Sequence, residues 1–137
     1  MILKQGEVAE VGHFVYTSST SVYGRALEPV DRAIWVDEQF EVAPRDIYDE
    51  TKLAAEALVA SAGFSTTVLR VAHYFAEAPH LTALHHLYRG VGASDVARAR
   101  VASLERADVR GIFNVAGPLI FERVDCVHLL GNESDVD

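Results

Sequence analysis

The sequence predicts an α/β fold with a mostly parallel sheet. Short apolar runs rich in β-branched residues alternate with longer segments of helical periodicity along the 137 residues, a pattern typical of βαβ units. No repeat, low-complexity tract or linker divides the chain, so we expect a single domain over residues 1–137. Half of the residues are hydrophobic and 23% are charged, a composition typical of folded globular proteins.

Three strands are predicted, each from a run of apolar and β-branched residues. They cover residues 13–19, 65–70 and 111–117. The first ends in the polar triplet Ser18-Ser19-Thr20. Because parallel sheets bind ligands at the carboxyl ends of their strands, this triplet marks a candidate site.

The clearest predicted helix covers residues 45–62, where Asp46 can cap the start and Gly63 ends the pattern. Four residues recur on it at helical spacing: Ile47, Thr51, Ala54 and Leu58. Two further helices are predicted at residues 94–107, opened by Ser94 or Asp95, and at residues 123–130.

Charge and cysteine content exclude several classes of function. The formal charge is −8, from 20 acidic and 12 basic residues, and the basic residues do not cluster, so we expect no nucleic-acid partner. No apolar run is long enough to cross a membrane. Cys126 is the only cysteine and cannot form an intramolecular disulfide, which favours a cytoplasmic location. It lies in an apolar stretch and is predicted to fill space in the core.

The pair Tyr48-x-x-x-Lys52 lies inside the predicted helix 45–62. A spacing of four places both side chains on one face, one turn apart. A phenol is a poor base at neutral pH, but an ammonium group held beside it favours the phenolate and makes it usable in acid/base chemistry. The spacing therefore indicates a proton-transfer site.

Five sequence blocks, in order, resemble the extended short-chain dehydrogenase/reductases of the NAD-dependent epimerase/dehydratase family. The blocks are Phe14 to Gly24 (FVYTSSTSVYG), Pro44-x-x-x-Tyr48-x-x-x-Lys52, Thr67 to Arg70 (TVLR), Asp95 to Ala99 (DVARA) and Phe113 to Pro118 (FNVAGP). The resemblance covers residues 13 to about 130 and implies part of a Rossmann-type parallel sheet with flanking helices.

The resemblance also implies roles for individual residues. Ser19 would bind the reacting oxygen of the substrate, with Thr20 as its nearest rival. Tyr48 would carry the proton, and Lys52 would bind the nicotinamide ribose. The resemblance implies an NAD or NADP cofactor that is contacted by five residues of the chain, and a substrate that is contacted by two residues. The cofactor set is Tyr48, Lys52, Ser18, Arg70 and Val71; the substrate set is Thr20 and His73.

The sequence departs from the family pattern in two places. It contains no Gly-x-x-Gly-x-x-Gly fingerprint, and the glycine-rich residues 90–95 are predicted to be a strand-to-helix turn. We therefore expect the catalytic-centre portion of such an enzyme without its cofactor-binding half. His73 stands where the family has asparagine. The segment at residues 79–90 is also very short for a lobe that binds a sugar nucleotide. A sugar derivative and a small alcohol or ketone both remain candidate substrates.

A second hypothesis is that the chain alone is a non-catalytic remnant or a subunit that folds by association. Loss of the cofactor half would leave the strand at residues 13–19 with an open edge. The family resemblance implies a homo-oligomer through the helix that carries Tyr48 and Lys52. No metal site is expected from His80, His85 and His86, because their spacing does not suit one helical face. The sequence also lacks the Gly-x-Ser-x-Gly elbow of a serine hydrolase.

Overall fold

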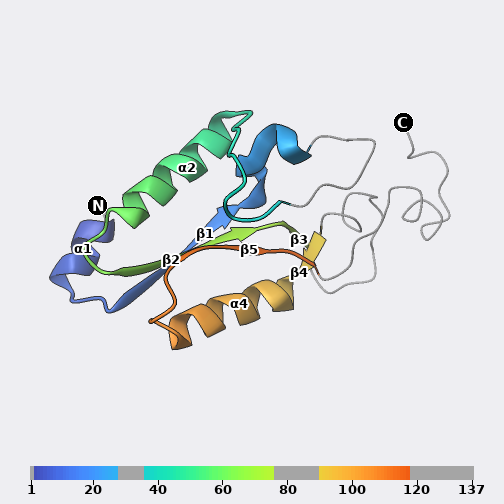
Figure 1. Ribbon diagram of the computed structural model, residues 1–137. Coiled ribbons are helices and arrows are strands. Elements are labelled where there is room, and N and C mark those ends of the chain that lie inside the picture. Colours follow the sequence, from blue (N-terminus) through green and yellow to red (C-terminus); the bar gives the residue numbers. More distant parts are fainter. Residues whose placement is uncertain (1, 28–35, 76–89, 118–137) are drawn as a thin grey trace, which may run out of the picture.

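The computed structural model describes residues 2–27, 36–75 and 90–117 and confirms the α/β architecture. Three parallel strands form a sheet in the order β1-β2-β5, and helices α2 and α4 lie on opposite faces of it (Figure 1). The bounds are β1 His13–Ser19, β2 Ser65–Val71, β5 Gly111–Val115, α2 Ile47–Ala60 and α4 Ala93–Glu105.

The strand register aligns side chains across the sheet. Ser18 pairs with Arg70, and Arg70 pairs with Asn114, so one row of residues crosses all three strands. Neighbouring residues along a strand point to opposite faces. This row faces α2, while Leu69 and Val71 of β2 face α4.

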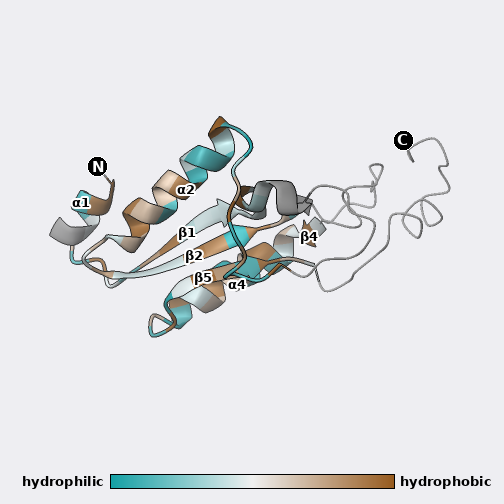
Figure 2. Ribbon diagram, turned by 45° about the horizontal axis from the view of Figure 1, so that its top comes forward, coloured by the Kyte–Doolittle hydropathy of each residue, from teal (hydrophilic) through white to brown (hydrophobic). Residues whose placement is uncertain are grey.

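The apolar core lies between the sheet and α4. Its four buried members are at most 5% exposed: Leu69, Val71, Val91 and Val96. Full burial of such an aliphatic side chain contributes about 1.5–3 kcal/mol. Val15, Ala99 and Val115 pack against this cluster. The α2 side of the sheet carries the buried polar residues Ser18, Arg70 and Glu56, and Figure 2 shows hydrophilic residues within the strands of the sheet.

Helix α2 has the predicted N-cap, but it begins at Ile47 rather than Arg45, and a different face of it is buried. The Asp46 carboxylate accepts the backbone N–H of Asp49 at 3.0 Å, which confirms the N-cap. The helix ends at Ala60 with Ser61 as its C-cap, two residues before the predicted Gly63. The residues at the predicted helical spacing, Ile47, Thr51, Ala54 and Leu58, are all exposed. Its buried residues are Asp49, Glu56 and Val59.

Several short elements were not predicted from the sequence. They are helix α1 (Ile2–Val8), the 3₁₀ segment η1 (Thr20–Leu27) and a parallel pair of strands, β3 (His73–Phe75) and β4 (Gly90–Gly92). The predicted turn at residues 90–95 was therefore wrong in part, because a short strand leads directly into α4. Gly92 is the N-cap residue of α4, and no side chain donates or accepts a capping hydrogen bond there.

The C-terminal part of the chain tests one of its two sequence predictions. Strand β5 ends at Val115, two residues before the predicted end at residue 117. The helix predicted at residues 123–130 lies outside the described residues. Within the part of the chain that the structure describes, no helix has the length and apolar character needed to cross a membrane.

Candidate active site

A cleft of about 600 Å³ lies at the carboxyl ends of β1 and β2, beside α2. Of the eight residues predicted for the site, six line the cleft: Ser18, Ser19, Tyr48, Lys52, Val71 and His73. Thr17, Ala72 and Arg100 complete the lining. Thr20 and Arg70 are not among the lining residues, so the structure brings together most of the predicted set but not all of it.

Tyr48 and Lys52 share one face of α2, as their spacing predicts. The Tyr48 side chain is 53% exposed and opens onto the cleft. The Lys52 ammonium donates to the backbone carbonyl of Thr17 at 3.0 Å and lies 5.6 Å from the centre of the Tyr48 ring. The contact with β1 holds a positive charge beside the phenol.

The Ser19 side chain is held by Ser21, two residues later in the chain. Its Oγ accepts the backbone N–H of Ser21 at 3.1 Å and the Ser21 hydroxyl at 2.9 Å. Because Ser19 is the acceptor in both bonds, its own O–H is left as a donor. A donor at the end of β1 can bind an oxygen atom of a ligand in the cleft.

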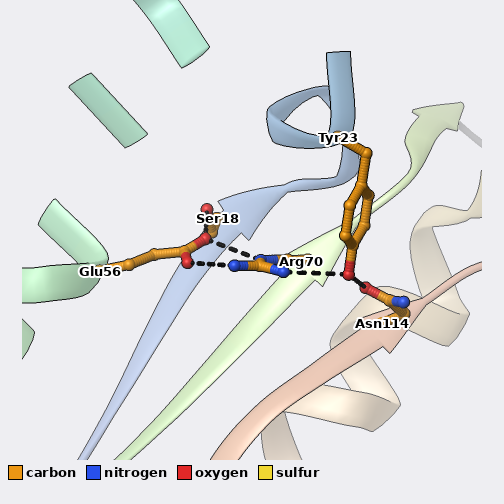
Figure 3. Close-up of polar contacts among 5 residues, drawn as sticks. All are labelled: Ser18, Tyr23, Glu56, Arg70 and Asn114. Carbon is orange, nitrogen blue, oxygen red and sulfur yellow. Dashed lines mark hydrogen bonds and ion pairs between the residues drawn. The ribbon is translucent and has the colours of Figure 1, made fainter. Parts of the chain in front are cut away.

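Ser18 and Arg70 belong to a buried polar network (Figure 3). Ser18 is 3% exposed, and its hydroxyl donates to Glu56 Oε1 at 2.5 Å. The Arg70 guanidinium is paired with Glu56 at 2.7 Å and donates to the Tyr23 hydroxyl at 3.0 Å. The Arg70 side chain is therefore committed to the protein interior, and any cofactor contact it makes is left to its backbone.

Electrostatics within this network favour the charged form of Arg70. Burial alone would lower the pKa of Arg70, but its hydrogen bonds to Glu56 and Tyr23 outweigh burial and raise that pKa above its ordinary value. A buried guanidinium with a carboxylate partner stays charged.

The cleft is cationic although the chain is acidic overall. Its lining residues include Lys52 of α2 and Arg100 of α4, and none of the described lining residues is an aspartate or a glutamate. Arg100 donates from Nε to the Thr17 hydroxyl at 3.2 Å. The cleft thus suits a ligand that carries negative charge or several hydroxyl groups.

Apart from the lining residues Thr17 and Ala72, sequence reasoning missed four residues of this region, and two of these four gave a positional signal. Glu56 follows Lys52 by four residues and so shares its helix face, and Arg100 follows the buried Val96 by the same interval. Tyr23 and Asn114 gave no such signal, because only the strand register and the path of η1 bring them to Arg70. Among the described residues no group of three or more acidic, histidine or cysteine side chains could hold a metal, and His80, His85 and His86 lie outside them.

A comparison with models of protein families matches residues 2–91 to the NAD dependent epimerase/dehydratase family. The chain belongs to this family. The match covers β1, the helix with Tyr48 and Lys52, and β2. A search of curated protein sequences finds no match.

Several solved structures share the fold of the chain. UDP-glucose 4-epimerase from Thermus thermophilus, in complex with NAD, is 18% identical with a TM-score of 0.70, over 99% of this chain and 54% of that one. UDP-glucuronic acid 4-epimerase from Bacillus cereus, with UDP-glucuronic acid and NAD, is 22% identical with a TM-score of 0.71, over 94% and 48%. RMD from Pseudomonas aeruginosa, complexed with NADPH, is 20% identical with a TM-score of 0.68, over 93% and 52%. The chain thus spans about half the length of each.

Proposed function

We propose that this chain supplies the proton-transfer side of an NAD(P)-dependent epimerase or dehydratase reaction. The observation that carries the proposal is the meeting of Ser19, Tyr48 and Lys52 at one cleft. These residues come from β1 and α2, in the family whose model matches the chain.

Each side chain has a role that its contacts support. Tyr48 transfers a proton to or from the substrate oxygen, because its phenol opens onto the cleft. Ser19 donates a hydrogen bond to the same oxygen and polarises it. Lys52 stabilises the phenolate form from its fixed place beside the ring.

The cleft fits the ribose half of a nicotinamide cofactor. Its hydroxyl-bearing and cationic lining offers hydrogen bonds to sugar hydroxyls. Lys52 and Tyr48 would hold the ribose through their side chains, and Ser18 and Val71 would hold it through their backbone. When bound, the nicotinamide accepts or returns a hydride. The sequence has no glycine fingerprint for the pyrophosphate. We infer that this part of the cofactor is bound by polypeptide outside the sequence of 137 residues.

The substrate class that we propose is a sugar derivative. Two of the structural neighbours are 4-epimerases of UDP-sugars, one of them bound to UDP-glucuronic acid. The departures at His73 and at residues 79–90 leave a small alcohol or ketone as the competing class.

An open strand edge and an exposed apolar helix face support the alternative that the isolated chain is not catalytic. Within the described residues, β1 pairs only with β2, so one of its edges is open to another strand. Ile47 and Leu58 are 76% and 62% exposed on the outer face of α2, which suits a homo-oligomer through this helix. A copy or partner would cover these surfaces.

A titration with NADH, followed by nicotinamide fluorescence and thermal shift, tests the proposal. We expect saturable binding, a dissociation constant raised about tenfold by Lys52→Ala, and no change with Lys4→Ala, a control that removes a lysine from α1. In a screen of sugar derivatives and small alcohols, Tyr48→Phe should lose turnover even at NADH concentrations that saturate the variant. No NADH binding by a folded sample would favour the non-catalytic subunit, and unchanged turnover in Tyr48→Phe would place proton transfer elsewhere.

A further inference from the structure

We infer that Arg70 and Glu56 form a positioning clamp that holds the Ser19 hydroxyl in a fixed place relative to Tyr48. The inference rests on the proposed function, since it assigns positioning roles to residues that the reaction does not touch. Neither side chain lines the cleft.

The clamp begins with the row of residues that the register places on the α2 face of the sheet. Ser18, Arg70 and Asn114 occupy equivalent positions on β1, β2 and β5. Glu56 reaches this row from α2, and Tyr23 reaches it from η1 (Figure 3). Five segments of the chain therefore meet around one guanidinium.

Arg70 uses all three of its guanidinium nitrogens in this contact. Nε donates to Glu56 Oε1 at 3.1 Å and one terminal nitrogen donates to Oε2 at 2.7 Å. The other terminal nitrogen donates to the Tyr23 hydroxyl at 3.0 Å, and that hydroxyl donates to Asn114 Oδ1 at 2.8 Å. The planar fork of an arginine fixes both partners in direction as well as distance.

The segment that contains Ser19 is anchored to this pair on both sides. On the N-terminal side of Ser19, the Ser18 hydroxyl donates a hydrogen bond to Glu56. On the C-terminal side, the Tyr23 hydroxyl accepts a hydrogen bond from Arg70, and Tyr23 is 1% exposed. The internal bonds from Ser21 to Ser19 Oγ then orient the hydroxyl within a segment whose two ends cannot move independently.

The same pair fixes the helix that carries Tyr48. Lys52 and Glu56 lie one turn apart on α2, and they bind Thr17 and Ser18, two consecutive residues of β1. Two contacts on successive turns fix both the position and the rotation of the helix relative to the strand. The acid/base residue and the hydroxyl donor are thus held by one network.

A purely stabilising role explains this arrangement poorly. Buried ion pairs often add little net stability compared with well-packed apolar residues, because both charges lose their hydration. They do impose direction, and here every bond leads toward the segment of Ser19 or the helix of Tyr48. Among the described residues no buried polar side-chain atom lacks a partner, so the network is fully satisfied.

Amide hydrogen exchange of the ¹⁵N-labelled chain tests the clamp without any cofactor. Tyr23→Phe removes one anchor and leaves the ion pair in place, and Ser18→Ala removes the other anchor. Each should speed exchange of the Ser21 amide about tenfold relative to the Leu69 amide of β2. The control is Val59→Ala, which empties space at a buried position of α2, and it should change both amides by similar factors.

Steady-state kinetics with a substrate that is turned over test the consequence. Tyr23→Phe should lower kcat about tenfold while KM and NADH affinity stay unchanged, because the clamp acts on geometry rather than on binding. The inference is wrong if both anchor variants change the Ser21 and Leu69 amides by equal factors, or if kcat is unaffected. Absence of NADH binding would count against the proposed function alone, since the exchange measurement still decides whether the clamp exists.

Discussion

The ammonium group of Lys52 donates a hydrogen bond to the backbone carbonyl of Thr17 at 3.0 Å. This contact joins the middle of α2 to β1 near its carboxyl end. It also places the charge 5.3 Å from the centre of the Tyr16 ring and 5.6 Å from that of Tyr48. Lys52 is thus a structural link between two elements of the site as well as its proposed source of positive charge.

Replacing this lysine should cost stability. We expect Lys52→Met to lower the free energy of unfolding by about 1–2 kcal/mol, because the charged hydrogen bond is lost while the aliphatic packing is kept. Urea denaturation measures the change. Lys4→Met, at an exposed position of α1, is the control and should leave the free energy within about 0.5 kcal/mol of the parent chain. A loss equal to that of the control would show that the Thr17 contact contributes nothing.

The ion pair between Glu56 and Arg70 should show strong coupling in a double-mutant cycle. Removing either partner leaves the other charge buried, so Glu56→Leu and Arg70→Met should each cost about 3–5 kcal/mol. The double variant should cost no more than the worse single variant, since it leaves no unpaired charge. Denaturant titration of all four proteins measures the coupling.

The exposed pair of Arg106 and Asp108 is the matched control for that cycle. Its charges remain hydrated when separated, so we expect little coupling between Arg106→Gln and Asp108→Asn. Additive losses at Glu56 and Arg70 would contradict the assignment of a buried, directional pair.

The sequence was sufficient for the parts of the fold that follow local periodicity. Strand β1 was predicted with its observed bounds, and α2 with its N-cap at Asp46, because alternating apolar runs and capping residues act over a few neighbours. The short pair β3 and β4 was missed. Three-residue strands carry no period, and their pairing depends on residues far apart in the chain.

The buried face of α2 shows why the site was only partly predictable. Apolar spacing pointed to Ile47 and Leu58 as one helix face, but that face is exposed, and Glu56 lies inside. A buried acid is stable only because Arg70 reaches it, and this pairing follows from the sheet register rather than from either local sequence. The same register places the Arg70 side chain in the interior, where it pairs with Glu56.

Gly24 should tolerate no larger residue. It has φ +55°, and a Cβ there would lie 1.4 Å from the carbonyl oxygen of Ala43. Gly24→Ala therefore combines left-handed strain with a backbone collision, and we expect it to cost about 3 kcal/mol or to prevent folding. Gly12→Ala is the control, because nothing lies within 4 Å of its added Cβ. Thermal unfolding that is equal for the two variants would contradict the prediction.

The Asp108 carboxyl should titrate at a lower pH than an unpaired aspartate. The hydrogen bond from Arg106 lowers the pKa of this carboxyl below its ordinary value of 3.8. Because the folded-state pKa is the lower one, the pair makes a small contribution to stability above the unfolded pKa, and this contribution is lost as the pH falls through the folded pKa. An NMR titration of the Asp108 carboxyl carbon should give a midpoint below 3.8, and Arg106→Gln should raise it. An unchanged midpoint in the variant would assign the shift to another cause.

Self-association through α2 should be sensitive to charge on its outer face. In a two-fold symmetric contact, residues near the axis meet their own copies, so a new glutamate on one helix faces a glutamate on the other. Leu58→Glu should therefore shift the sedimentation profile at micromolar concentration from dimer toward monomer. Leu104→Glu on α4, where the parent side chain is similarly exposed at 57% against 62%, is the control and should leave the profile unchanged. A monomeric parent chain, or an equal shift with both variants, would show that α2 is not the interface.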